Sequence, residues 1–362
     1  DVEDATNVLI LGTTWTDTAG NAYGGSSTDT ANFTIDTTAP TVASFTTATA
    51  TGSYKQGEAI VITANTSEAI QSGNTITVTL DTTDTVVLTA ASAGTTLVGT
   101  YTVGANDTSA GLTVSSFSIG TVADTAGNAM TSTTLPAASS IFGTKTIIID
   151  TTAPTGAITY SAASPYKQNA TATITATFTE ALTTTPKIAI SGVSSVTATN
   201  MSGSGTTWTY TYTAPAGDGT ETIVFSVGTD AAGNTVTATP TSGATFTVDN
   251  TSPSMIITAA DVSTGSTTND STLALTFITN EATSNFAVTD IAVTNGSLSS
   301  FVSTDDDTYT ATFTPDGDGA TTIDVAAGAY TDAAGNNNTA ASQFAWTYDG
   351  TGPTMTIAST TS

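Results

Sequence analysis

Two short motifs recur in a fixed order along this chain, and they constrain its fold more than any other feature. Copies of the first, Asp-x-Ala-Gly-Asn, begin at Asp17, Asp124, Asp230 and Asp332. Copies of the second, Asp-x-Thr-x-Pro, follow and begin at Asp36, Asp150, Asp249 and Asp349. An ordered pair that recurs in this way indicates a tandem array. Its period of about 100 residues is the size of one β-sandwich domain.

The residues between the motifs alternate in a way that predicts β-strands. Segments 207–213 and 308–314 carry threonine at every second position, with mostly aromatic residues between. A period of two places alternate side chains on opposite faces of a strand. The side chains expected in a core are Trp208, Tyr210 and Tyr212, and those expected at the surface are Thr207, Thr209, Thr211 and Thr213. No segment long enough to form a helix shows an apolar period of about 3.6 residues, so the protein is predicted to be all-β.

The motif spacing divides the chain into three complete domains with a partial domain at each end. The complete domains are expected at 37–150, 151–249 and 250–349. Residues 1–36 are expected to be the C-terminal part of an earlier domain, and residues 350–362 the first strand of a following one. The chain is therefore expected to be a window on a longer array. Because a proline in each linker fixes φ, the domains are predicted to lie end to end as a semi-stiff rod.

Strand positions follow from the same alternation. After Asp150 we expect strands at 156–160, 171–179, 187–191, 208–213, 221–227 and 244–248, with an irregular segment after the third. In the next repeat we expect them at 255–258, 272–278, 286–294, 309–314, 321–326 and 343–348. The first complete repeat is longer, and its extra residues are expected in a hairpin at 75–89 and in the loop after Asn128. Segments 7–14, 31–35 and 355–358 are expected to be strands of the partial domains.

The composition excludes several classes of function. The chain has 30 acidic residues against 4 lysines, no His and no Cys, and its net charge is −26. Such a charge repels nucleic acid, which is excluded as a partner. Without His or Cys, Ser-His-Asp and Cys-His catalysis is impossible, and the acids occupy equivalent places in every repeat, so no enzyme is expected. No apolar run approaches the roughly 18 residues of a membrane span, so no membrane insertion is expected from this segment.

These motifs resemble those of the bacterial immunoglobulin-like repeats of large surface adhesins and surface-layer proteins. The resemblance rests on the two recurring motifs, on a glutamate-alanine step after the second strand (Glu68-Ala69, Glu180-Ala181, Glu281-Ala282), and on segment 289–298. It covers essentially the whole chain. It implies immunoglobulin-like antiparallel sandwiches and an extracellular setting, at the cell surface or secreted.

In an immunoglobulin-like sandwich, the incoming linker, the loop after the second strand and the loop before the last strand share one pole. Each complete domain should therefore gather a linker aspartate, the glutamate and the aspartate of Asp-x-Ala-Gly-Asn, with the asparagine nearby. The predicted sets are Asp36, Glu68, Asp124 and Asn128; Asp150, Glu180, Asp230 and Asn234; and Asp249, Glu281, Asp332 and Asn336. Carboxylates brought together repel unless a cation binds. An all-oxygen set favours Ca²⁺, so three structural calcium sites are predicted.

The alternative is that the motifs are only turns. Gly can supply a positive φ while the aspartates accept backbone N–H groups. The acidic turns at 217–219 and 316–319 are also read as β-turns at the opposite pole. The segments Tyr54-Lys55-Gln56 and Tyr166-Lys167-Gln168 are read as loop anchors, with lateral contact to another chain as the alternative.

The functional hypothesis is a structural extender of a surface or secreted adhesin-type protein, with its junctions stiffened by calcium. Its expected partners are the neighbouring repeats of the same chain. One alternative is a subunit of an extracellular filament or surface layer, in which other copies of the chain are partners. Another is a module whose threonine-rich strands bind carbohydrate, ice or a host surface.

Overall fold

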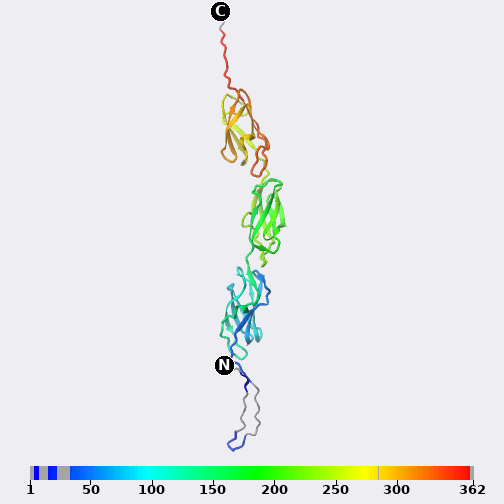
Figure 1. Cartoon of the computed structure of the whole chain (residues 1–362), viewed down its shortest axis with the longest axis vertical. Coiled ribbons are helices and arrows are strands. Elements are labelled where there is room, and N and C mark those ends of the chain that lie inside the picture. The colour runs from blue at the N-terminus through cyan, green and yellow to red at the C-terminus, as the bar shows by residue number, and fades with distance from the viewer. Residues whose placement is uncertain (1–3, 8–14, 23–32, 284, 359–362) are drawn as a thin grey trace. The chain divides into compact units, whose positions relative to one another are not determined.

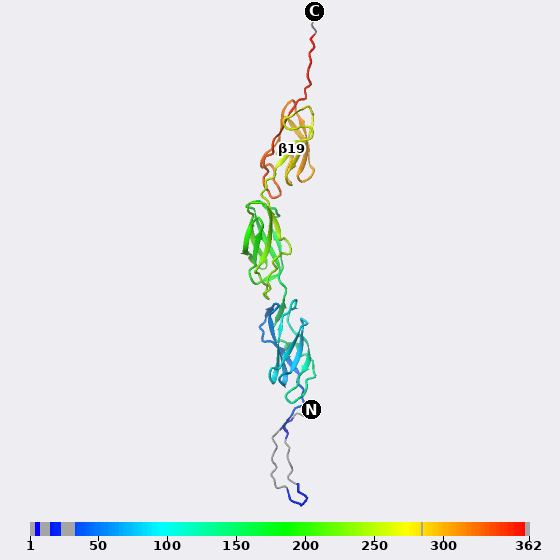
Figure 2. The ribbon, with the colours of Figure 1, turned by 180° about the vertical axis from the view of Figure 1, so that it is seen from behind.

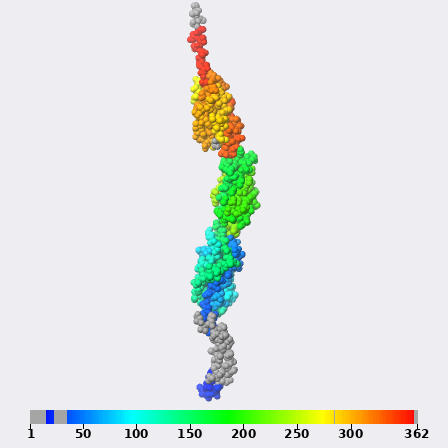
Figure 3. Space-filling view, viewed as in Figure 1, coloured from blue at the N-terminus to red at the C-terminus, as the bar shows by residue number. Residues whose placement is uncertain are grey.

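The protein is described here from a computed structural model, which places residues 4–7, 15–22, 33–283 and 285–358. The remaining residues are drawn in grey in Figures 1 and 3. The chain forms two compact units: one holds Asp1–Ala153 and Thr229–Asn234, and the other holds Pro154–Gly228 and Thr235–Ser362. Strands dominate both units, and the helical turns among the described residues are two short 3₁₀ turns. None of the described helices is long and apolar enough to span a bilayer.

The first unit contains a sandwich of two sheets. Its larger sheet has the order β10-β6-β7-β8-β5-β3, and its smaller sheet the order β4-β11-β9. The bounds are β3 Val42–Thr46, β4 Gly52–Tyr54, β5 Ala59–Ile70, β6 Thr75–Leu80, β7 Thr85–Thr89, β8 Gly94–Thr102, β9 Thr108–Ser109, β10 Val114–Thr121, η1 Ala138–Ser140 and β11 Ile147–Asp150. Both sheets contribute to one core, in which Phe45, Ile62 and Ile149 are buried. Before it, β1 (Asp4–Asn7) pairs with β2 (Phe33–Ile35).

The second unit begins with a sandwich of three and four strands, coloured green in Figure 1. The sheet orders are β12-β13-β16 and β15-β14-β17-β18. The bounds are β12 Gly156–Tyr160, β13 Thr171–Leu182, β14 Lys187–Ser191, β15 Ser195–Asn200, β16 Ser202–Thr213, β17 Gly219–Ser226 and β18 Thr245–Val248. Ile174, Tyr212 and Phe225 meet in its core. The segment expected to be irregular after β14 is instead the regular strand β15, which pairs antiparallel with β14.

A third sandwich, whose β19 is labelled in Figure 2, completes the second unit. Its sheets have the orders β19-β21-β24-β23 and β20-β26-β25-β22. The bounds are β19 Met255–Ala259, β20 Thr267–Thr268, β21 Leu273–Thr279, η2 Val288–Asp290, β22 Ile291–Thr294, β23 Gly296–Ser303, β24 Thr308–Pro315, β25 Gly319–Val325 and β26 Phe344–Tyr348. Most neighbouring strands are antiparallel, but the short β20 pairs parallel with β26, as β4 does with β11. The predicted all-β sandwich fold is confirmed.

The predicted alternation is confirmed in β16. Trp208 and Tyr212 are buried and Tyr210 packs against the same core, while Thr207, Thr211 and Thr213 are exposed and Thr209 is half-buried. Aromatic rings reinforce this core, since Tyr212 contacts Phe246 edge-on with ring centroids 4.8 Å apart. The hairpin predicted at 75–89 is also present, as the antiparallel pair β6–β7.

Two predicted strands were wrong, and two others lie partly outside the described residues. The strand expected at 286–294 is only β22, because the amide of Ala287 donates to the Asp290 carboxylate and closes the turn η2 before it. Segment 355–358 forms no strand in the structure. The strand predicted at 31–35 is confirmed over its described residues, which form β2. Segment 7–14 lies outside the described residues apart from Asn7, the last residue of β1.

The register of β21 predicts unequal costs for two adjacent truncations. Phe277 is fully buried, whereas Ile278 is 42% exposed on the opposite face. Phe277→Ala should lower the free energy of unfolding of this sandwich by about 3–5 kcal/mol, and the control Ile278→Ala by less than about 1 kcal/mol. Hydrogen exchange of peptides from 255–348 in the full chain measures both. Equal losses would place the strand in the wrong register.

Candidate metal centre

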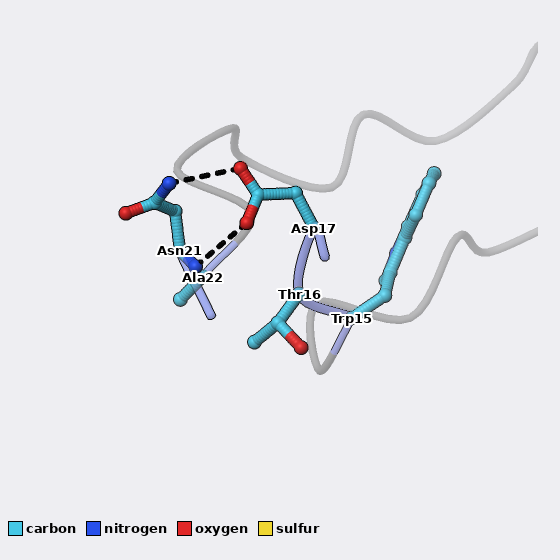
Figure 4. Close-up of a pocket in the computed structure, with 5 residues that line it drawn as sticks. All are labelled: Trp15, Thr16, Asp17, Asn21 and Ala22. Carbon is cyan, nitrogen blue, oxygen red and sulfur yellow. Dashed lines mark hydrogen bonds between the residues drawn. The ribbon is translucent and has the colours of Figure 1, made fainter. Parts of the chain in front are cut away.

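The motif Asp-x-Ala-Gly-Asn folds into the same turn in four places. In Figure 4 the backbone and side-chain amides of Asn21 donate to the two carboxylate oxygens of Asp17, at 2.9 and 2.8 Å. The same pair of hydrogen bonds forms at Asp124, Asp230 and Asp332. The glycine of each copy has φ between +85° and +101°, a conformation that favours glycine. The sequence of the motif is therefore accounted for by the turn, and its carboxylate is held in place.

The glutamate is placed beside this turn by the strand β5 or β21, at whose end it lies. Glu68 lies near the end of β5, and Glu281 follows β21 by two residues. In each case the threonine two residues earlier donates its hydroxyl to the glutamate carbonyl, at 2.7 Å for Thr66 and 2.6 Å for Thr279. Single β-bridges then join this segment to the turn, Ile70 to Asp124 and Thr283 to Asp332. The glutamate and the turn aspartate are thus brought side by side.

The linker aspartate joins them through the turn asparagine. The side-chain amide of Asn128 donates to the backbone carbonyl of Asp36 at 3.0 Å, and that of Asn336 donates to Asp249 at 2.9 Å. Each linker carboxylate also caps its own turn, since Asp249 Oδ1 accepts from the amide of Thr251 at 3.0 Å. The asparagine therefore contributes a brace between linker and turn.

Two of the predicted carboxylate sets converge within single units. In Asp36, Glu68 and Asp124, and again in Asp249, Glu281 and Asp332, one carboxylate oxygen from each residue lies within 4.8 Å of the others. The remaining set is divided between the units. Asp150 and Asp230 belong to the first unit, where Asn234 donates to the Asp150 carbonyl and the Asp230 carboxylate, both at 2.9 Å. Glu180 lies on β13 in the second unit.

The electrostatics differ among the members of a set. Burial raises the pKa of Asp124, but hydrogen bonds from Asn128 and Gly127 outweigh burial and hold that pKa below its usual value. The pKa of Glu281 shifts in the opposite direction, because burial and the charges of Asp249, Asp332 and Asp218 all raise it. Its Oε1 atom is buried and has no hydrogen-bond partner among the described residues. Burial and like charges therefore act on the Glu281 carboxyl in the same direction.

The donor set fits a hard divalent cation. The three carboxylates of each set offer oxygen ligands, which suit Ca²⁺, and Ca²⁺ would complete its coordination with carbonyls or water. The buried Glu281 Oε1 is the observation that favours a cation, because a cation would satisfy an atom that the turn hydrogen bonds leave without a partner. A cavity of about 180 Å³ is lined by Ala282, Thr283, Asp306 and Ala333 and offers room for water. Ala282 and Ala333 directly follow Glu281 and Asp332 in the sequence.

The sequence pattern did not identify Asp218 as part of this region. Its carboxylate accepts from the amide of Asn250 at 2.5 Å and from the hydroxyl of Thr251 at 3.0 Å, which fixes the linker directly after Asp249. Asp318 makes equivalent contacts with Gly350 and Thr351. Positive φ values at Gly217 and Gly219 agree with the predicted turn. The recurrence of Gly-Asp-Gly was the available signal, but the turn's link to the linker was not visible in the sequence.

Fold and site together define a class of all-β repeat proteins in which linker carboxylates meet carboxylates of the sandwich that follows. Residues 249–348 match the family model described as a bacterial Ig-like domain, which confirms the resemblance for this sandwich. No curated protein matches the chain. One similar solved structure is that of invasin, a bacterial integrin-binding protein, with 14% identity and a TM-score of 0.29 over 77% of this chain. The chain spans 56% of that structure's length.

The raised pKa of Glu281 predicts a pH effect in the absence of divalent cations. A carboxyl whose folded pKa is raised contributes stability that is present below its unfolded pKa and lost as pH rises through the folded value. In chelator, the stability of the third sandwich should therefore fall as pH rises above about 4.3, the ordinary pKa of Glu. It should fall by more in the wild type than in Glu281→Gln. Calorimetry at several pH values tests this. If wild type and variant follow the same pH profile, Glu281 is not under repulsion.

Proposed function

We propose that this chain is a structural extender of a bacterial cell-surface or secreted protein of the adhesin type, and that Ca²⁺ stiffens its junctions. The observation that carries the proposal is the carboxylate set Asp249, Glu281 and Asp332, with its counterpart Asp36, Glu68 and Asp124. In each set one carboxylate comes from a linker and two come from the sandwich after it. A cation bound there would hold the linker against that sandwich.

Mass action explains how calcium would act. An ion that binds only when the three carboxylates are assembled stabilises that arrangement by RT ln(1 + [L]/Kd). Extracellular calcium modules work with Kd values of about 10⁻⁴ to 10⁻³ M, so a site of modest affinity would respond to calcium outside the cell. The scarcity of basic residues, 4 against 30 acidic ones, leaves metal ions as the main available counter-charge. The repeated, equivalent placement of the acids supports a structural role over a catalytic one.

Calcium should reverse the effect of Glu281→Gln on the stability of the third sandwich. With calcium at about 100-fold over Kd, the wild-type third sandwich should gain about 2.7 kcal/mol. Glu281→Gln should lose most of that gain, since it removes a charged ligand, yet it should be more stable than wild type in chelator because it also removes repulsion. Calorimetry of the full chain with calcium or chelator measures both states.

The matched control is Asp261→Asn, which removes the same charge at an exposed position outside the set. It should respond to calcium as the wild type does. A wild-type chain that is indifferent to calcium would leave the motifs as turns that cap themselves.

A specific surface favours a second candidate function, the binding of neutral carbohydrate. On the outward face of β13 and β16, cross-strand neighbours are threonine pairs at 171/213, 173/211, 175/209 and 177/207, and Thr159 of β12 extends one row. These rows carry no charge in a chain of net charge −26. Their hydroxyl and methyl groups could meet the hydroxyl and C–H groups of an uncharged polysaccharide. A surface-layer or filament role would use the same kind of uncharged face between copies of the chain.

Co-sedimentation with insoluble neutral polysaccharides, such as cellulose and chitin, tests the carbohydrate candidate. If the threonine rows bind, Thr209→Glu should abolish pelleting, because it places a charge in the middle row. Thr222→Glu places the same charge at an exposed position on β17 in the other sheet and should leave pelleting unchanged. Absence of wild-type pelleting would reject this candidate and leave the extender role unaffected.

A further inference from the structure

Two of the four lysines make the same contact with a turn far along the chain. Nζ of Lys167 donates to the carbonyl of Gly335 at 2.7 Å, and Nζ of Lys55 donates to the carbonyl of Gly233 at 2.9 Å. Both glycines belong to Asp-x-Ala-Gly-Asn turns. Lys167 and Gly335 lie in the second unit, and Lys55 and Gly233 in the first, so each contact is internal to one unit. The contact therefore occurs twice, independently.

The tyrosine before each lysine fixes its position. Tyr166 is buried, bridges Val248 in parallel, and donates its hydroxyl to the Ala162 carbonyl at 2.6 Å. Its own carbonyl accepts from the amide of Asp249 at 3.0 Å. Tyr54 pairs in parallel with Ile149 in the same way. Each Tyr-Lys-Gln segment is thus fastened to the end of the strand that leads into a linker, and the lysine extends beyond it.

The next residue strengthens the connection in the second unit. The amide of Gln168 donates to Oδ1 of Asn250 at 2.5 Å, and Asn250 in turn donates to the Asp218 carboxylate. Lys167 is therefore held on a segment that is hydrogen-bonded to the linker on both sides of Asp249. Its ammonium group spans from this segment to the turn that presents Asp332.

The other lysines provide the contrast. Nζ of Lys145 donates to the carbonyls of Thr47 and Thr49, both at 2.8 Å, within its own sandwich. Nζ of Lys187, on β14, makes no hydrogen bond with the described residues. The turn contact is therefore specific to the lysines of the two Tyr-Lys-Gln segments. The earlier interpretation of these segments as loop anchors holds for their tyrosines, and the lysines do something further.

We propose that Lys55 and Lys167 are metal-independent clasps that hold an Asp-x-Ala-Gly-Asn turn in place before any cation binds. The part of this inference that concerns cations rests on the proposed function. If a site binds only when its turn and linker are assembled, its apparent Kd is the intrinsic Kd divided by the assembled fraction. By raising that fraction, Lys167 acts as a positioning residue for the Asp249, Glu281 and Asp332 set.

Because the chain has only four lysines, amine acetylation of the unmodified full-length protein tests the clasp directly. The protein is treated with a limiting N-hydroxysuccinimide ester of acetate in chelator, and each lysine is followed by mass spectrometry of its own peptide. Lys55 and Lys167 should react about 2- to 10-fold more slowly than Lys187, the factor expected for one net hydrogen bond. Equal rates for Lys167 and Lys187 would overturn the clasp.

Repeating the acetylation in calcium separates the two proposals. By reciprocity of linked equilibria, calcium binding should slow acetylation of Lys167 further, while leaving Lys187 unchanged. Slow reaction in chelator with no further effect of calcium supports the clasp and counts against the cation site.

A substitution completes the test. Lys167→Met should weaken calcium binding at the third sandwich about 2- to 10-fold, the factor of the same hydrogen bond, as measured by calcium titration of hydrogen exchange in residues 329–340. Lys187→Met, the control, should leave the titration midpoint unchanged. Equal midpoints for wild type and Lys167→Met would show that the lysine does not position the turn.

Discussion

The side-chain amide of the turn asparagine is the contact on which the organisation of each site depends. Asn336 donates simultaneously to the Asp332 carboxylate at 2.8 Å and to the Asp249 carbonyl at 2.9 Å, and Asn128 does the same at 2.7 and 3.0 Å. One planar group therefore fixes the turn and attaches it to the incoming linker. A carboxylate in that place could not donate either bond. The linker and turn aspartates lie close together because this amide joins the two segments that carry them, and a β-bridge to the turn brings in the glutamate.

Much of the fold could be predicted because the physics that determines it is local. Alternating threonine and aromatic residues define two faces of a strand, and Trp208 and Tyr212 are buried as that rule requires. The rule failed where a side chain competed with the strand, as when the Asp290 carboxylate accepts the Ala287 amide and closes a 3₁₀ turn. It also missed β15, whose exposed residues give no apolar pattern and which forms by pairing with β14.

The acidic residues of the site could be predicted, but the residues that hold the linker and the turn by hydrogen bonds could not. The aspartates and glutamates recur at fixed places, so their convergence followed from the pole they share. Asp218 contacts residues 32 and 33 positions away, and Lys167 contacts a glycine 168 positions away. The residues around Asp218 and Lys167 in the sequence do not indicate a contact partner so far along the chain. The sequence placed the asparagine beside the carboxylates, but it did not show that the amide group joins the linker to the turn.

The division of each site between a linker and the sandwich after it has a genetic consequence. The linkers share the Asp-x-Thr-x-Pro pattern. Removal of residues 151–249 would therefore place Asp150 directly before Asn250-Thr251-Ser252-Pro253 and form an Asp-x-Thr-x-Pro sequence again. Asp150 would then take the place of Asp249 in the set with Glu281 and Asp332. Recombination between repeats can therefore lengthen or shorten the array by whole units while every surviving junction keeps a complete set of acids.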